Sequence, residues 1–152
     1  MITKQTPNSP IGVFDSGLGG LTVLKYLEKI LPNESFIYFG DTAHVPYGTK
    51  SAEMVTLYSQ HIMDFFLKYE TKAVVIACNT ASAVAFQHLK RNYDIPLFDV
   101  VSPSVEYSMK ITKTQKIGVV GTYSTIQSGA YKRMFKQLGD SCSVQEISCP
   151  LF

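Results

Sequence analysis

Six short apolar runs alternate with helical patterns along this chain, and this alternation limits what it can fold into. The runs cover residues 11–14, 36–39, 73–77, 97–101, 117–120 and 144–147. Each run has the length and composition of a strand that is buried on both faces. Strands of that kind, separated by helices, form a mostly parallel sheet. The sequence therefore predicts an α/β fold, a parallel-sheet βαβ sandwich.

Five helices are predicted between these runs. Ser51 has the side chain of a helix cap, Pro103 suits a first helical turn, and Gly139 suits a helix end. The expected positions are residues 21–31, which carry a leucine stripe, residues 51–69, the segment after residue 78, the segment from 102, and residues 127–138.

The predicted organisation is two domains. Residues 1–10 are interpreted as a flexible polar tail, residues 11–101 as most of a first α/β domain, and residues 102–152 as the incomplete start of a second α/β domain. Leu151 and Phe152 follow the last predicted strand almost directly. Because an apolar end in this place is typical of a cut, we expect this chain to be a piece of a longer protein.

Composition argues against several classes of protein. Hydrophobic residues make up 45% and charged residues 17%, as in a globular protein, and a net charge of +2 without a basic cluster argues against nucleic-acid binding. The apolar runs are too short to cross a bilayer, and the polar N-terminus lacks the apolar stretch of a signal peptide. A cytoplasmic location is expected. Three cysteines without CxxC spacing predict neither disulfides nor a zinc site.

Cys78 is the first candidate for chemistry. It follows the run 73–77 and precedes a predicted helix, at the place where open α/β sheets bind ligands. The partial positive charge of a helix N-terminus favours a thiolate, the form of cysteine that acts as a base or nucleophile. The alternative is a structural cysteine that fills the core.

Residues 15–20 form an acidic, glycine-rich turn after the first run. They fit neither phosphate-loop pattern, because no lysine follows and Thr22 stands where the last glycine belongs. Asp15 would repel a phosphate, whereas Asp15 and Ser16 together suit an ammonium group. The alternative is a helix cap followed by a turn.

A polar loop at residues 40–50 follows the second run. It contains Asp41, Thr42 and His44, and loops at strand ends are where binding residues concentrate. The alternative is an ordinary connection in which Asp41 and Thr42 bond only to the backbone.

Small hydroxyl residues follow the fifth run, at residues 121–126. At a helix start they suit an anionic group such as a carboxylate. The alternative is a simple helix cap by Ser124 or Thr125.

These strand ends share acid and hydroxyl groups and a thiol, without a set of metal ligands. They predict a site that binds a small zwitterion and uses a cysteine as the acid–base group. A cysteine hydrolase is a weaker alternative, because none of His44, His61 and His88 clearly follows a strand end next to Cys78.

At these motifs the chain resembles the cofactor-independent glutamate racemases of bacterial cell-wall synthesis. The resemblance covers nearly the whole chain, although the wider aspartate/glutamate racemase superfamily shares parts of it. The matching motifs are D-S-G-L-G-G at residues 15–20, Asp41-Thr42 with Pro46-Tyr47-Gly48, C-N-T-A-S at residues 78–82, Gly121-Thr122 with Thr125-Ile126, and C-P-L-F at residues 149–152.

The resemblance implies that L- and D-glutamate are interconverted without pyridoxal phosphate, metal or other cofactor. Two cysteines flank the α-carbon; one removes the α-proton as thiolate and the other returns a proton as thiol. Cys78 matches one of these bases, and Asp15 is expected to assist its proton transfer. The residues that match substrate contacts are Asp15, Ser16, Tyr47, Gly48, Asn79, Thr80, Thr122 and Thr125.

The second cysteine of the family, in a Cys-Thr-His motif, does not occur in this sequence. Cys142 is expected to be structural or incidental, and Cys149 matches another family position. The chain resembles a little over half of a racemase, so we expect it to be at best a poor racemase alone. The resemblance also implies a supply of D-glutamate for peptidoglycan and a possible homodimer.

Two other functions stay open at this point. One is a racemase for another acidic amino acid, aspartate, or for hydantoin-type substrates. The other is a non-catalytic remnant that binds amino acids.

Overall fold

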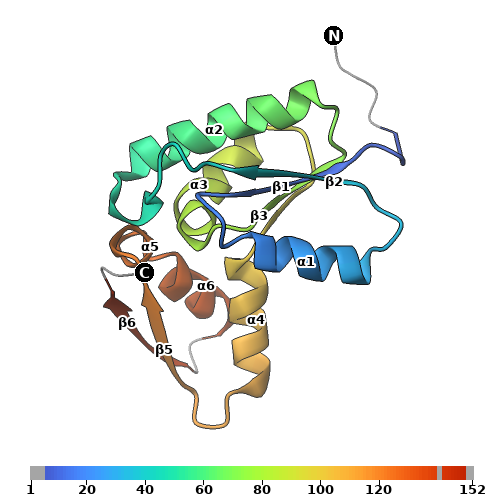
Figure 1. Cartoon of the computed structure of the whole chain (residues 1–152). Coiled ribbons are helices and arrows are strands. Elements are labelled where there is room, and N and C mark those ends of the chain that lie inside the picture. Colours follow the sequence, from blue (N-terminus) through green and yellow to red (C-terminus); the bar gives the residue numbers. More distant parts are fainter. Residues whose placement is uncertain (1–5, 140–141, 150–152) are drawn as a thin grey trace.

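A computed structural model describes residues 6–139 and 142–149, and it contains two parallel sheets (Figure 1). The first sheet has the strand order β2-β1-β3-β4, and all three of its pairings are parallel. Its strands are β1 (Ile11–Asp15), β2 (Phe36–Gly40), β3 (Ala73–Ile76) and β4 (Leu97–Asp99). The second sheet pairs β5 (Lys116–Gly121) with β6 (Ser143–Ser148), also in parallel. The predicted α/β class is confirmed.

Helices separate the strands as the sequence predicts. They are α1 (Leu21–Ile30), the short 3-10 helix η1 (Tyr47–Thr49), α2 (Ala52–Lys68), α3 (Asn79–Asn92), α4 (Val101–Ile111), α5 (Tyr123–Gln127) and α6 (Ala130–Leu138). Ser51 caps α2 as expected, because its hydroxyl accepts the Met54 N–H at 3.3 Å. No helix within the described ranges is long and apolar enough to cross a membrane.

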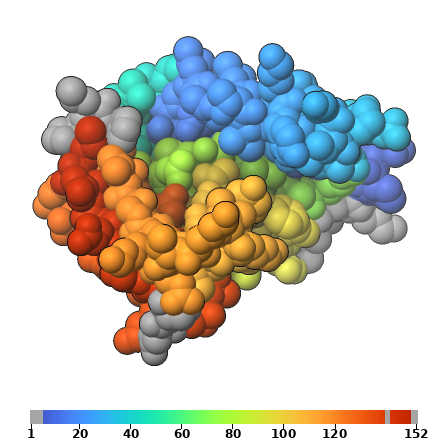
Figure 2. All heavy atoms as spheres, turned by 90° about the horizontal axis from the view of Figure 1, so that it is seen from below, coloured from blue at the N-terminus to red at the C-terminus, as the bar shows by residue number. Residues whose placement is uncertain are grey.

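The carboxyl ends of β1, β2 and β3 lie at one edge of the first sheet, and the second sheet adjoins this edge. Helix α5 contacts both η1 and α3, so it joins the two parts. Figure 2 shows a hollow between the blue N-terminal segment and the orange and red C-terminal segments, which include α4 and the second sheet, with green atoms from the middle of the chain at its floor. The strand ends that carry the candidate residues therefore meet.

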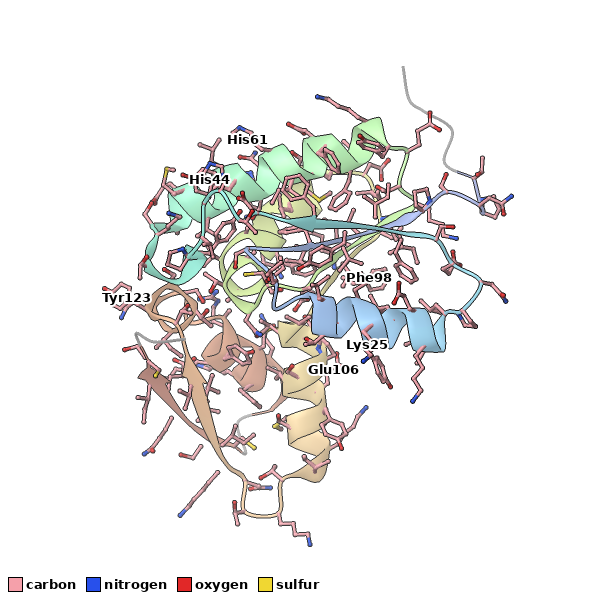
Figure 3. The ribbon with its side chains drawn as sticks, in the orientation of Figure 1. Lys25, His44, His61, Phe98, Glu106 and Tyr123 are labelled. Carbon is pink, nitrogen blue, oxygen red and sulfur yellow. The ribbon has the colours of Figure 1, made fainter. Side chains whose placement is uncertain are left out.

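The main core lies between the first sheet and helices α2 and α3. Val74 and Ile76 of β3 are fully buried there against Phe66 and Leu89. The other face of the sheet is covered by α1, where an apolar cavity of about 380 Å³ remains. Phe98 of β4 lines this cavity and is 57% exposed (Figure 3). A smaller core joins α4 and α6 to the second sheet.

Strand β4 is shorter than predicted, because a helix begins inside the run 97–101. The Asp99 carboxylate accepts the N–H groups of Val101 and Ser102, both at 2.7 Å, and the Ser102 hydroxyl at 2.5 Å. These N–H groups have no partner inside the helix, so a carboxylate that accepts them favours a helix start at this point. The predicted strand was wrong at Val100 and Val101, and α4 begins one residue before the predicted Ser102.

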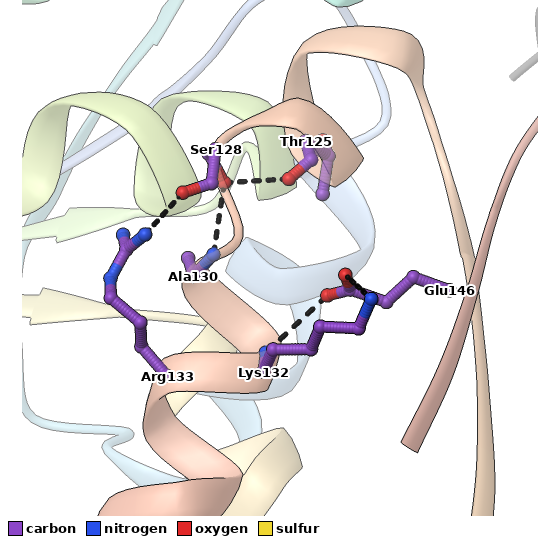
Figure 4. Close-up of polar contacts among 6 residues, drawn as sticks. All are labelled: Thr125, Ser128, Ala130, Lys132, Arg133 and Glu146. Atoms are coloured by element: carbon purple, nitrogen blue, oxygen red, sulfur yellow. Dashed lines mark hydrogen bonds and ion pairs between the residues drawn. The ribbon is translucent and has the colours of Figure 1, made fainter.

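The helix predicted at residues 127–138 is broken. Gly129 has φ +62, a left-handed conformation, and it separates α5 from α6. Figure 4 shows the junction, in which the Ser128 hydroxyl donates to the Thr125 carbonyl at 2.6 Å and accepts the Ala130 N–H at 3.2 Å. The guanidinium of Arg133 donates to the Ser128 carbonyl. The predicted end of the helix before Gly139 is confirmed.

Residues 1–5 of the predicted tail and residues 150–152 lie outside the described residues. Residues 6–10 contain a turn in which Ser9 is buried and its hydroxyl accepts the Thr6 N–H at 3.1 Å. The Pro10 carbonyl accepts the Lys72 N–H at 2.9 Å, next to the first residue of β3.

Gly20 lets α1 begin in contact with the ends of β1 and β3. A Cβ at this position would lie 2.6 Å from Asp15 Cβ and 2.9 Å from Ala77 Cβ. We expect Gly20→Ala to lower the free energy of unfolding by about 1–3 kcal/mol, because overpacking displaces backbone. Urea unfolding followed by circular dichroism measures this.

Gly118→Ala is the matched control. A Cβ at Gly118 would have no neighbour within 4 Å, so the free energy of unfolding should stay level or rise by less than about 1 kcal/mol. Equal destabilisation by both substitutions would contradict the close packing at Gly20.

Candidate active site

Cys78 lies between the end of β3 and the start of α3, as the sequence predicts. It is the N-cap residue of α3, and its sulfur accepts the Ala81 N–H at 3.4 Å. The thiol donates to the Ser16 hydroxyl, also at 3.4 Å, and the residue is 6% exposed. The thiol is therefore held between two strand ends, at the edge of the sheet.

Burial determines the protonation of this thiol. It raises the pKa of Cys78 above its ordinary value of 9.0, and the charge of Asp15 raises it further. The hydrogen bonds with Ser16 and Ala81 act in the opposite direction without reversing the shift. The N–H of Ala81 at the start of α3 lowers this pKa, as expected of a helix end, but loss of water at the sulfur outweighs it and the pKa is raised overall.

Asp15 is a buried carboxylate at the end of β1. It is 7% exposed, and its Oδ2 accepts the Gly17 N–H at 3.1 Å. No lysine, arginine or histidine within the described residues forms an ion pair with it. Burial, followed by the charges of Asp15 and Cys78, raises the pKa of Tyr38 to about 12. The negative character of this edge favours a cationic ligand group.

The loop at residues 40–50 is held by side chains as well as by backbone. The Asp41 carboxylate accepts the Tyr47 hydroxyl at 2.6 Å, and it lies 2.8 Å and 3.0 Å from His44 Nδ1. The alternative in which Asp41 bonds only to backbone was wrong. Tyr47 is 1% exposed and its hydroxyl is already bonded to Asp41, so its side chain is not open to a ligand.

Gly48 brings this loop against the second sheet. A Cβ at Gly48 would lie 2.5 Å from both Cβ and Cγ2 of Thr122. The Ser124 hydroxyl lies 2.9 Å from the Gly48 carbonyl and 2.6 Å from the Lys50 carbonyl. Ser124 was not among the predicted site residues, because a contact between residues so distant in the sequence leaves no local signal.

Three hydroxyls, which we call the threonine triangle, join the two sheets. Thr80 lies 3.0 Å from Thr122 and 3.1 Å from Thr125, and the last two are 2.8 Å apart. Thr122 also caps α5 by accepting the Thr125 N–H at 3.2 Å, so the predicted cap by Ser124 or Thr125 was wrong. Hydroxyls rotate, and those of the triangle can turn towards a carboxylate.

The remaining candidates lie around this junction. Asn79 is exposed at the start of α3, and its Oδ1 accepts the Tyr131 hydroxyl at 2.8 Å. Cys149 follows β6, and its N–H donates to the Gly121 carbonyl at 2.7 Å. Within the part of the chain that the structure describes, no hydrogen bond joins Cys142 or Cys149 to Cys78, and no group of three metal-ligating side chains occurs.

The histidines do not complete a hydrolase site. His44 bonds to Asp41, and His88 bonds to Gln60 at 3.2 Å. Figure 3 shows His61 on α2 and His44 next to this helix. No hydrogen bond between a histidine and Cys78 occurs among the described residues, so the hydrolase alternative is not favoured.

Comparison with known proteins identifies a family. The sequence profile of the Asp/Glu/hydantoin racemase family matches residues 11–150. The glutamate racemase of Geobacter metallireducens is 48% identical over 146 residues, which are 96% of this chain and 54% of that protein. That of Aquifex aeolicus is 46% identical over 142 residues, which are 93% of this chain and 55% of that protein.

Solved structures agree with the sequence match. A glutamate racemase isoform from Bacillus anthracis superposes with a TM-score of 0.92 at 40% identity, over 95% of this chain and 55% of its own. The glutamate racemase from Francisella tularensis, solved in complex with D-glutamate, has a TM-score of 0.88 at 42% identity, over 95% of this chain and 54% of its own. This chain therefore spans about half the length of the relatives that it matches.

The pKa of Cys78 should follow the charge of Asp15. In a chain with Cys142→Ser and Cys149→Ser, we expect the midpoint of the pH profile of iodoacetamide alkylation to lie above that of an ordinary cysteine, because burial raises this pKa. Asp15→Asn should shift the alkylation profile to lower pH, and Ser16→Ala should shift it to higher pH. Mass spectrometry over a pH series measures both, and shifts of the same sign would contradict the assigned causes.

The threonine triangle should stabilise the junction of the two sheets. Thr125→Val removes one hydroxyl at nearly constant shape, and we expect the free energy of unfolding to fall by about 1–2 kcal/mol. Thr22→Val is the control, because this exposed hydroxyl bonds only to the Gly19 carbonyl and its loss should cost less than about 0.5 kcal/mol. Equal losses in the free energy of unfolding for the two variants, measured by urea unfolding, would argue that the triangle does not stabilise the junction of the two sheets.

Proposed function

We propose, because this chain belongs to the Asp/Glu/hydantoin racemase family, that it carries one half of the proton-transfer machinery of a glutamate racemase. The observation that carries this proposal is the buried Cys78 thiol beside the buried Asp15 carboxylate, which has no cationic partner among the described residues. A carboxylate in this position would pair with the ammonium group of an amino acid. Aspartate and hydantoin are less favoured as substrates, because the matched relatives are named glutamate racemases.

The polar groups divide into two sets that suit the two ends of an amino acid. In this proposal, Asp15 and Ser16 bind the ammonium group. The threonine triangle, the backbone of Tyr47 and Gly48, and the Asn79 side chain bind the carboxylate groups; the contacts that join the triangle and Asn79 to their neighbours support this division. Donors aimed at a carboxylate also stabilise the negative charge that develops when the α-proton leaves, which is usually the largest contribution to catalysis.

Substrate binding would activate the thiol. Burial and, to a smaller extent, the charge of Asp15 raise the pKa of Cys78, so an ammonium group beside Asp15 would lower this pKa. Cys78 can then lose its proton to solvent and, as thiolate, remove the α-proton of glutamate. The electron pair of the broken C–H bond stays on the α-carbon, and the proton ends on sulfur. A positioned base of this kind contributes about 10²–10⁴-fold to the rate.

Inversion needs a second acid on the opposite face of the α-carbon. Within the described residues, neither Cys142 nor Cys149 is hydrogen-bonded to the site around Cys78. Cys78 can return a proton only to the face from which it took one. The chain alone is therefore expected to exchange the α-hydrogen of glutamate with solvent and to retain its configuration.

In the whole protein, this activity would supply D-glutamate for peptidoglycan in the cytoplasm. A homodimer and a division into domains near residue 101 belong to the same proposal. The two separate sheets support the division.

The test is hydrogen exchange without inversion. The 152-residue chain is incubated with L- or D-glutamate in deuterated water, and proton NMR follows the α-hydrogen while chiral chromatography follows inversion. We expect loss of the α-proton signal for one enantiomer with little inversion. Cys78→Ser should reduce the exchange at least about a hundredfold, because it removes the base.

Cys142→Ser is the matched control and should leave the exchange rate unchanged. Absence of both exchange and glutamate binding would overturn the proposed function. Fast inversion by the chain alone would overturn the one-sided mechanism.

A further inference from the structure

We propose that Asp41 is a positioning residue, which fixes the loop of residues 41–50 so that Gly48 lies against Thr122 and closes the candidate site. The consequence for glutamate rests on the proposed function. The positioning of the loop is argued from the contacts of Asp41 and does not depend on the proposed function.

Asp41 is a buried carboxylate that the proposed proton transfer does not use. It is 6% exposed and directly follows β2. Its N–H donates to the Asp15 carbonyl at 2.9 Å, so its backbone is tied to the neighbouring strand end. Its carboxylate bonds to Tyr47 and to His44 across the loop. The residue thus joins the rigid sheet to the loop.

On the side of the first sheet, the loop is held by the bonds of Asp41 and by the Tyr47 ring, which packs in the main core. Residues 42–46 are exposed, whereas Tyr47 and Gly48 are buried. On the side of the second sheet, the Ser124 hydroxyl donates to the carbonyls of Gly48 and Lys50. Two polar anchors, one from each side, therefore act together with the buried Tyr47 ring to position Gly48.

The fit at Gly48 tolerates little displacement. A Cβ there would overlap Thr122 at 2.5 Å, so the glycine backbone packs directly on this side chain. Thr122 is a member of the threonine triangle, which is placed for a carboxylate of the ligand. A shift of the loop would therefore change the site where the ligand binds.

An ionised carboxylate is the group that suits the place of Asp41. It can accept hydrogen bonds from both the Tyr47 hydroxyl and the His44 Nδ1–H group, whereas the side-chain amide of asparagine presents one acceptor oxygen. Burial, followed by the bond with Asp41, raises the pKa of Tyr47, so its hydroxyl remains a donor. His44 also stacks on Tyr58 with ring centroids 4.1 Å apart, which limits its movement.

The experiment compares Asp41→Asn and Tyr47→Phe with Asp64→Asn. The control breaks a similar pair, because Asp64 accepts the Tyr93 hydroxyl at 2.9 Å on the exposed side of α2. Tyr47→Phe keeps the buried ring, so it carries the test if Asp41→Asn does not fold.

The first measurement needs no ligand and has two NMR readouts. One is the nuclear Overhauser effect between the Gly48 α-protons and the Thr122 methyl group. The other is the hydrogen-exchange rate of the Lys50 amide, which donates to the Tyr47 carbonyl at 3.0 Å. We expect both loop variants to lose the contact and to exchange the Lys50 amide about tenfold faster or more. The Val74 amide in the core should be unchanged, and Asp64→Asn should match the unaltered chain.

The second measurement is the concentration dependence of α-hydrogen exchange of glutamate. The half-saturating concentration should rise about tenfold or more in the loop variants, while the maximal rate changes much less, because Asp41 acts through binding and not through Cys78. A merely destabilised chain would lower the maximal rate instead.

The outcomes separate this proposal from the proposed function. An unchanged Gly48–Thr122 contact in Asp41→Asn and Tyr47→Phe would overturn the positioning role. A displaced loop with an unchanged half-saturating concentration of glutamate would show that the loop does not contribute to substrate binding. If the unaltered chain neither binds glutamate nor exchanges its α-hydrogen, the proposed function fails, and the ligand-free measurement still decides whether Asp41 fixes the loop.

Discussion

A carboxylate buried without a cation governs the edge of the first sheet. Asp15 is excluded from water beside the Cys78 thiol, and no cationic side chain of the described residues neutralises it. Such burial is costly. Burial of the sulfur, and to a smaller extent the charge of Asp15, raises the pKa of the neighbouring Cys78. The same strand end is so closely packed that Gly20 has no room for a side chain. Ligand charge, thiol ionisation and local packing are therefore coupled at one place.

The junction of the two sheets completes the site. The threonine triangle takes one hydroxyl from α3 and two from the start of α5, and Ser124 bonds back to the carbonyls of Gly48 and Lys50. The contacts of Thr80 with Thr122 and Thr125, and those of Ser124, all cross between the two parts of the chain. The groups suited to a carboxylate are thus assembled by the packing of α5, while the thiol and Asp15 belong to the first sheet alone.

Membership of the racemase family and a length of about half that of its relatives have one chemical consequence. A racemase must exchange protons on both faces of the α-carbon, and the described residues place one thiol at the site. What this chain holds is sufficient for binding and for one-sided proton transfer in the proposed mechanism. In the proposed mechanism, proton transfer on one face of the α-carbon therefore needs only this chain, whereas transfer on the other face needs a second acid.

The sequence by itself determined the α/β class, the six strands and the position of Cys78 at a strand end, because apolar periodicity and glycine turns are local signals. It did not reveal the helix start inside the run 97–101, because Val100 and Val101 favour a strand, whereas the Asp99 carboxylate accepts the first N–H groups of a helix. The tertiary structure alone decided the raised pKa of Cys78, the bond between Asp41 and Tyr47, and the reach of Ser124 to Gly48. Burial and contacts between distant residues set these properties, and neither leaves a mark in the neighbouring sequence.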